Sequence, residues 1–165
     1  YKNIGLDINY LFSPNISIDA TLNPNYSNIN QDAAEINNTA FETYYDENRS
    51  FFIEQSSFFF TPIEIFYSRR LGKEFINYNF NNQNYFFNNS LDLATRILGK
   101  TNNGLLYGFL GAQTDVNASV YDNDFRFNNT KAYYSVFRIK KNISRKKSYI
   151  GIMSTNYDFR ELRIY

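Results

Sequence analysis

The sequence contains no cysteine, no histidine and no tryptophan, and only three prolines and seven glycines among its 165 residues. Without cysteine the chain forms neither disulfides nor thiolate metal sites, and without histidine it lacks the commonest metal ligand and general base. The Ser-His-Asp, Cys-His and histidine–metal classes of active site are therefore excluded together. Only carboxylates, lysine, tyrosine and serine remain for any chemistry. We expect no metal ion and no other cofactor.

Strong net charge and long apolar runs are also missing. The 17 lysines and arginines nearly balance 16 acidic residues, which gives a net charge of +1. This balance provides no electrostatic footprint for nucleic acid, so nucleic acid is not an expected partner. No stretch approaches the roughly 20 apolar residues of a membrane-spanning helix. No signal peptide is recognisable before the first expected strand, so we expect the chain to be a fragment of a longer protein.

Aromatic and polar residues are abundant instead. The 15 tyrosines and 17 phenylalanines make the chain 19% aromatic, yet the mean hydropathy is only -0.50 because strongly polar residues are interleaved with them. Tyrosine and phenylalanine favour strands, whereas the numerous asparagines favour turns. This composition favours a sheet with two chemically different faces.

Alternation of apolar and polar residues predicts three antiparallel hairpins. The first joins residues 4–12 and 16–22 around Ser-Pro-Asn, and the second joins residues 91–100 and 105–112 around Thr-Asn-Asn-Gly, a strong hairpin turn. The third joins residues 131–141 and 147–157. We also expect a strand at residues 63–71 and polar loops at residues 77–89 and 115–130.

The expected connections differ in length in a regular way. In an up-and-down sheet the three short turns would lie at one end and the long connections at the other, as in outer-membrane barrels. Charges on the polar strand faces and aromatic residues near the strand ends favour the same architecture. We predict an all-β fold, an antiparallel up-and-down meander that is part of an outer-membrane-type β-barrel, with residues 1–165 as one partial barrel domain. Residues 23–60 would be an irregular plug or long-loop segment, and a soluble β-sandwich remains the alternative.

The aromatic and charged stretch at residues 21–70 holds the candidate site. Its glutamates could include a carboxylate pair for glycoside hydrolysis. The interpretation that we favour pairs them with nearby arginines inside a polar lumen, because buried charges need partners. Arg69 and Arg70 are also suited to bidentate contacts with an anionic or sugar ligand. We assign no catalytic residue, and the ligand-binding candidates are Glu42, Glu47, Arg49, Glu54, Arg69 and Arg70.

Three ordered motifs carry a resemblance to a known family. Residues 23–32 resemble its Asn-Pro-Asp-Phe-Ser-Gln-Val-Glu-Ala-Asp run, and residues 41–54 resemble its Phe-Glu…Phe-Phe-Pro-Glu-Lys-Arg-Pro-Phe-Phe-Leu-Glu run. Residues 66–72, Phe-Tyr-Ser-Arg-Arg-Leu-Gly, are nearly its Phe-Tyr-Ser-Arg-Arg-Ile-Gly. The family is the domain of unknown function 5916, the C-terminal region of proteins labelled carbohydrate-binding family 9 domain-containing. In this sequence Asp46 and Ser50 replace the two prolines of the central motif.

The resemblance implies a location and a set of partners. The family is common in Bacteroidota and related Gram-negative bacteria, and it is similar to an outer-membrane β-barrel preceded by a periplasmic carbohydrate-binding-like module. It therefore implies the cell outer membrane as location, with membrane lipid, carbohydrate and the remainder of the same barrel as partners. The expected role is binding or transport of carbohydrate-related material. The alternatives are a glycan-acting hydrolase that uses paired carboxylates and a soluble all-β binding domain.

Overall fold

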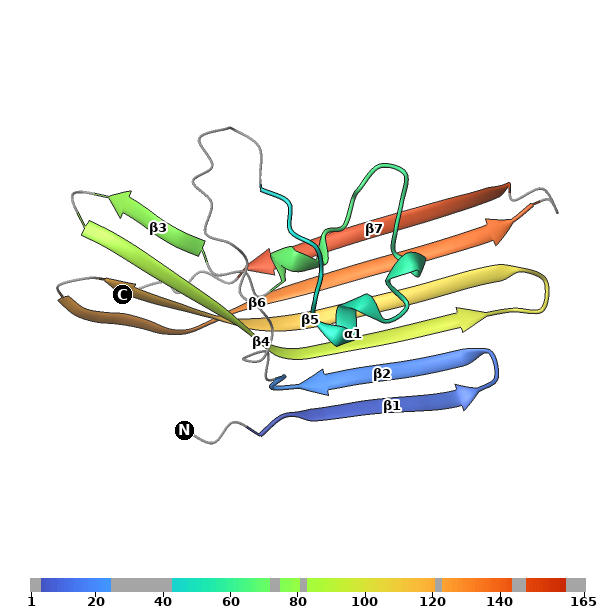
Figure 1. The fold of residues 1–165 in the computed structure, drawn as a ribbon, viewed down its shortest axis with the longest axis horizontal. Helices are drawn as coiled ribbons and strands as arrows, with labels where there is room; N and C mark the ends of the chain where they lie inside the picture. The colour runs from blue at the N-terminus through green and yellow to red at the C-terminus, as the bar shows by residue number, and fades with distance from the viewer. Residues whose placement is uncertain are drawn as a thin grey trace.

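A computed structural model of the chain describes residues 4–24, 43–71, 75–80, 83–120, 123–143 and 148–159. Its strands form one antiparallel sheet, and six of them follow the order β1-β2-β4-β5-β6-β7, while β3 pairs with β4 (Figure 1). Their bounds are β1 (Leu6–Ser13), β2 (Ile16–Leu22), β3 (Phe75–Phe80), β4 (Gln83–Lys100), β5 (Leu105–Val120), β6 (Asn123–Asn142) and β7 (Tyr149–Phe159). The all-β antiparallel meander is confirmed. The described sheet is open, with β1 and β7 at its two edges.

The three predicted hairpins are present. They pair β1 with β2, β4 with β5 and β6 with β7, and the strand ends joined within each pair lie at the same end of the sheet (Figure 1). In the turn between β4 and β5, Gly104 has a φ of 78°, a left-handed conformation that glycine adopts without steric cost. The amide of Gly104 donates a 3.1 Å hydrogen bond to the carbonyl of Thr101. Turn chemistry and alternation therefore fix these elements locally.

Two predicted polar loops are wrong, because both regions are strands. The described residues of 77–89 belong to β3 and β4, and those of 115–130 belong to β5, which ends at Val120, and β6, which begins at Asn123; residues 81–82 and 121–122 lie outside the described residues. Asn88 of β4 pairs with Asn117 of β5, and similar pairs continue along both strands. Backbone hydrogen bonds between antiparallel strands form whatever side chains the strands carry. The asparagine-rich composition had favoured loops because asparagine is depleted from ordinary strands.

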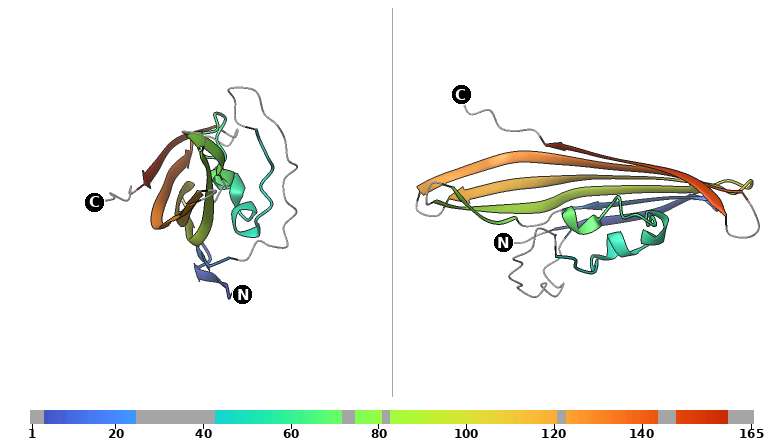
Figure 2. Two further views of the ribbon diagram at one scale, coloured as in Figure 1. Left: turned by 90° about the vertical axis from the view of Figure 1, so that its left-hand side faces the viewer. Right: turned by 90° about the horizontal axis from the view of Figure 1, so that it is seen from above.

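The predicted strand at residues 63–71 is also wrong. This region is irregular and ends in a short 3-10 helix, η2 (Ser68–Arg70). It belongs to residues 43–71, the covering segment, which also contains α1 (Ser50–Ile53) and η1 (Ser56–Phe58) and lies across one face of the sheet (Figure 2). Within this segment Tyr67 and Leu71 are buried while Ile63 is exposed, so packing rather than strand pairing decides the local conformation. The plug segment predicted at residues 23–60 is irregular where described, and residues 25–42 lie outside the described residues.

The core lies between the covering segment and the sheet. Phe51, Phe52 and Phe59 from the segment pack with apolar side chains of the strands, among them Leu110 and Val136. We call this side the covered face; it also carries Asp19, Thr21, Ala94, Arg96, Ala112 and Arg138, all buried. Burying several phenylalanines contributes roughly 2 kcal/mol each, which is enough to hold a segment with little regular structure of its own.

The opposite side, the bare face, is apolar and exposed. One row of directly paired residues crosses five strands, and its members are Tyr10, Ile18, Ile97, Phe109 and Phe137. Ile97 and Phe109 are 37% and 38% exposed. No second sheet packs on this face among the described residues. Within the same part of the chain, no helix has the length and apolar character needed to cross a membrane.

Candidate functional site

Arg96 of β4 joins the sheet to the covering segment. Its side chain is almost fully buried, and its Nε donates a 3.0 Å hydrogen bond to Oδ2 of Asp19 on β2. Its Nη1 donates to the carbonyl oxygens of Phe51, at 2.6 Å, and of Glu54. These carbonyls lie in and after the last turn of α1, where helical backbone oxygens lack partners within the helix. The guanidinium carbon also lies 4.9 Å from the Phe51 ring centre, within cation–π range.

Arg138 of β6 contacts η1 in the way that Arg96 contacts α1. It is buried, and its Nη1 donates to the carbonyl oxygens of Phe58 and Phe60, the latter at 2.5 Å. Its guanidinium carbon lies 5.8 Å from the Phe58 ring centre. Each sheet arginine thus satisfies backbone acceptors of one short helix and contacts a phenylalanine of that helix. The two arginines hold the covering segment in register with the strands.

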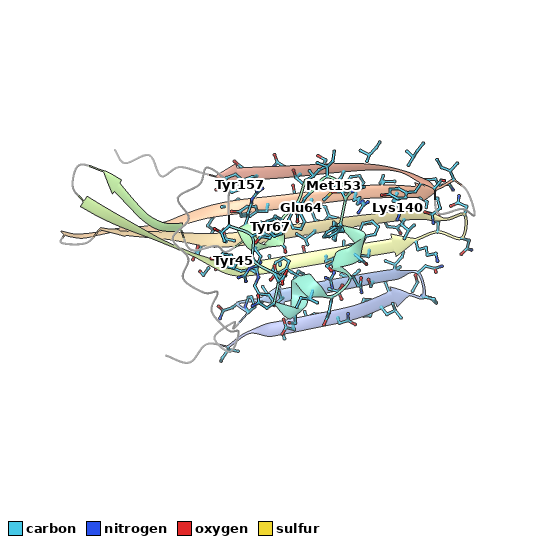
Figure 3. The ribbon with its side chains drawn as sticks, turned by 45° about the horizontal axis from the view of Figure 1, so that its top comes forward. Tyr45, Glu64, Tyr67, Lys140, Met153 and Tyr157 are labelled. Carbon is cyan, nitrogen blue, oxygen red and sulfur yellow. The ribbon has the colours of Figure 1, made fainter. Side chains whose placement is uncertain are left out.

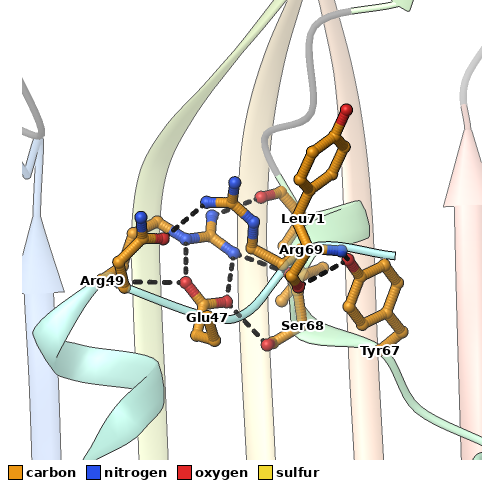
Figure 4. A network of polar contacts seen from close by, with 8 residues as sticks. Glu47, Arg49, Tyr67, Ser68, Arg69 and Leu71 are labelled. Carbon is orange, nitrogen blue, oxygen red and sulfur yellow. Dashed lines mark hydrogen bonds and ion pairs between the residues drawn. The ribbon is translucent and has the colours of Figure 1, made fainter. Parts of the chain in front are cut away.

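Arg49 and Glu47 form a third polar centre inside the covering segment (Figure 4). Nη2 of Arg49 lies 2.7 Å from Oε2 of Glu47, and Nε donates to Oε1 at 2.8 Å, so the pair is bidentate. The Ser68 hydroxyl donates to Oε2 of Glu47 at 2.6 Å. Arg49 also donates to the carbonyl oxygens of Ser68, at 2.8 Å, and Leu71. This network connects α1 to η2 across the segment.

The Glu47 carboxyl is ionised over a wide pH range. Burial alone raises its pKa, but the hydrogen bonds and the charge of Arg49, together with the hydrogen bond from Ser68, outweigh burial. The net pKa lies below the ordinary value of 4.5. A general acid in glycoside hydrolysis needs a raised pKa, so Glu47 is poorly suited to donate a proton to a leaving group.

The remaining predicted ligand-binding residues are spread over the segment. Glu42 lies outside the described residues. The side chain of Glu54 is 65% exposed, and its Oε2 is 3.9 Å from Nη2 of Arg96. Arg69 donates from Nη1 to Oδ1 of Asn48 at 3.0 Å, and the guanidinium carbon of Arg70 lies 5.9 Å from the Tyr67 ring centre. The structure therefore brings Glu47 and Arg49 together and places Glu54 beside a sheet arginine.

The sequence-based site omitted the sheet residues Asp19, Arg96 and Arg138. A signal for them was present, since each is a charged residue at a polar-face position of an alternating strand. That pattern predicted a wet interior rather than specific partners. Asp19 and Arg96 are 77 residues apart in the chain, so only the strand register brings them into contact. Among the described residues, no three acidic side chains gather in a way that could hold a metal ion.

A family model described as "Domain of unknown function (DUF5916)" matches residues 1–160. No curated protein and no solved structure matches the chain.

Proposed function

The chain belongs to the DUF5916 family, and from this membership and its two-faced sheet we propose that it forms part of the wall of an outer-membrane β-barrel. In this arrangement the bare face contacts lipid, and the covering segment lies in the lumen. The protein then binds or transports carbohydrate-related material at the cell envelope.

The reversed burial of charged and apolar side chains carries the proposal. Arg96 is 1% exposed and its neighbour Ile97 is 37% exposed, and the same contrast recurs along β6. A soluble monomer rarely exposes a contiguous apolar surface of more than a few hundred Å². A barrel in a bilayer needs this arrangement, because its outer side chains face hydrocarbon while its lumen is polar.

Strand length supports the same assignment. A strand that crosses the hydrocarbon core with a tilt needs about 9–11 residues. β4, β5 and β6 contain 18, 16 and 20 residues, and the apolar row lies in the part of each strand nearest the β4–β5 turn. The excess length would then extend beyond the membrane, on the side away from the short turns. Outer-membrane barrels have short periplasmic turns and longer outer extensions.

The open edges define the partner that the wall requires. β1 and β7 each pair with one described strand, and an unpaired strand edge is not tolerated in hydrocarbon. We infer that further strands of the same barrel pair with these two edges. The covering segment would remain inside, held to the wall by Arg96 and Arg138.

Fractionation of the natural protein tests the location. We expect it in the outer-membrane fraction, resistant to extraction with high salt and urea, with a gel mobility that changes on boiling, as folded barrels show. The matched variants Phe137→Arg and Tyr149→Arg separate the two faces, since Phe137 lies on the bare face and Tyr149 on the covered face. Loss of assembly only for Phe137→Arg supports the proposal. A protein that stays in the soluble fraction contradicts it.

A further inference from the structure

A cavity of about 670 Å³ lies between the covering segment and the last two strands. Its segment side is formed by residues 65–67 and 70–71, and its strand side by residues 134–136 of β6 and 155–157 of β7. Ligand sites typically measure about 300–1,000 Å³, so the cavity is large enough for a small ligand. Arg96, Arg138 and Glu47 do not line this cavity.

Tyrosine rings line both sides of this cavity. Tyr134 and Tyr157 are directly paired across β6 and β7, with ring centres 4.7 Å apart and planes inclined by 39°. Tyr67 lines the cavity from the covering segment, on the same part of the sheet as Tyr157 in Figure 3. The Tyr67 ring stacks on Tyr44 with ring centres 4.2 Å apart. Its hydroxyl both accepts from the amide and donates to the carbonyl of Tyr45, each at 2.8 Å, which fixes the ring in place. The rings are therefore held in position as flat, partly polar walls.

Arg70 supplies the cationic group of the cavity wall. Arg70 is exposed, and its guanidinium carbon lies 5.9 Å from the centre of the Tyr67 ring. A guanidinium group binds carboxylate or sulfate through two parallel hydrogen bonds. The described lining of the cavity therefore combines ring surfaces, hydroxyl groups and the positive charge of Arg70.

We propose that this cavity binds an acidic sugar unit of an oligosaccharide, with the pyranose ring against the tyrosines and its carboxylate or sulfate on Arg70. The tyrosine and threonine hydroxyls of β6 and β7 are suited to the many hydroxyl groups of a sugar. This inference rests on the proposed carbohydrate role. It adds that the sugar is negatively charged, and it names the residues that would recognise the charge and the ring.

The structure also provides a matched control pair. Lys140 and Tyr149 lie on the same covered face, with Nζ of Lys140 4.1 Å from the ring centre of Tyr149, but neither lines the cavity. In Figure 3, Lys140 lies far along the sheet from Tyr67 and Tyr157. Substitutions in this pair remove a cation or an aromatic ring from the same face without touching the proposed site.

Calorimetric titration of the purified natural protein tests the inference, with tetragalacturonate and its fully methyl-esterified form as probes. We expect the acid to bind and the neutral ester to bind at least about tenfold more weakly, because a charge-assisted bond is lost. Arg70→Gln and Tyr157→Ala should each weaken binding of the acid about tenfold or more. Lys140→Gln and Tyr149→Ala should leave it within about twofold.

The outcomes separate this inference from the proposed function. Equal binding of acid and ester, or equal loss in the control pair, overturns the acidic-sugar site and leaves the membrane wall and a neutral carbohydrate role in place. Binding of neither probe by a heat-modifiable, membrane-embedded protein overturns the site while the wall assignment stands. Retained Arg70-dependent binding by a protein that never enters the membrane supports the site and overturns the wall.

Discussion

Phe137 and Arg138 are consecutive residues of β6 with reversed exposure: Phe137 is 43% exposed and Arg138 is 3% exposed. Alternation along a strand sends the two side chains to opposite faces. Arg138 is buried because it donates to the backbone carbonyls of Phe58 and Phe60, whereas Phe137 continues the apolar row of the bare face. The carbonyls of the covering segment satisfy Arg138, but in water the exposed apolar row that contains Phe137 is unfavourable. Lipid against the bare face would remove that cost.

The buried pair of Asp19 and Arg96 predicts a strong and non-additive effect on stability. Arg96→Met leaves the Asp19 carboxylate without its cation, and removing one partner of a buried ion pair costs about 3–5 kcal/mol of unfolding free energy. In the double variant with Asp19→Leu, the loss should be smaller than the sum of the two single losses. Urea unfolding followed by circular dichroism measures all three. Arg69→Met, which removes the exposed hydrogen bond to Asn48, is the control and should cost less than Arg96→Met. Additive losses would argue against the buried pair.

The Glu47 network predicts a loss of stability in acid. Since the folded pKa lies below the ordinary value, ionised Glu47 stabilises the fold fully above pH of about 4.5, and this contribution falls as the pH drops through the folded pKa. Glu47→Gln should therefore be less stable than the natural protein near neutral pH, and the difference should shrink as the pH falls through the folded pKa of Glu47. Unfolding titrations at several pH values measure it. A difference in stability that does not change with pH would contradict the ionic role of Glu47. Glu54→Gln serves as the control, because the side chain of Glu54 is largely exposed.

Gly108 allows the covering segment to approach the sheet. A Cβ atom at this position would lie 2.3 Å from Cε1 of Phe58 and 2.6 Å from Cδ2 of Leu98. Gly108→Ala should therefore displace the segment and destabilise the protein by about 1–3 kcal/mol, as overpacked cores do. Trypsin should then cleave faster after Arg69 and Arg70.

Gly111 provides the matched control for this substitution. Gly111 lies on the bare face, and the atom nearest to a Cβ added there would be Cε1 of Phe109, at 3.2 Å. Gly111→Ala should leave the cleavage rate after Arg69 and Arg70 close to that of the natural protein. Equal acceleration in both variants would show that the glycine at position 108 has no special relation to the segment.

The sequence predicted those parts of the fold that depend on local patterns. Alternation and turn residues identified the hairpins at residues 4–22, 91–112 and 131–157, including the Gly104 turn. It missed the asparagine-rich halves of β4 to β6, because a backbone ladder there carries no apolar signature. It assigned a strand to residues 63–71, where apolar spacing reflects packing of Tyr67 and Leu71 on the sheet.

The candidate site was less predictable than the fold. The Glu47–Arg49 pair could be predicted because the two residues are close in sequence, and opposite charges at such a spacing are expected to pair. The hydrogen bonds from Arg96 and Arg138 to backbone carbonyls could not be predicted, since every residue has a carbonyl and the sequence does not show which one accepts. The cavity beside Tyr134 and Tyr157 depends on the register of β6 and β7 and on the path of the covering segment.

The central claim is that the bare face contacts lipid, and the absence of tryptophan permits a direct test. Phe137→Trp and Tyr134→Trp each introduce a single tryptophan on β6, one on the bare face and one on the covered face. The measurement compares the tryptophan fluorescence of each variant with that of the unsubstituted natural protein, reconstituted in bilayers with and without brominated acyl chains. We expect the fluorescence added by Phe137→Trp to be strongly quenched and that added by Tyr134→Trp to be weakly quenched. Unquenched, water-exposed emission from Phe137→Trp would contradict it.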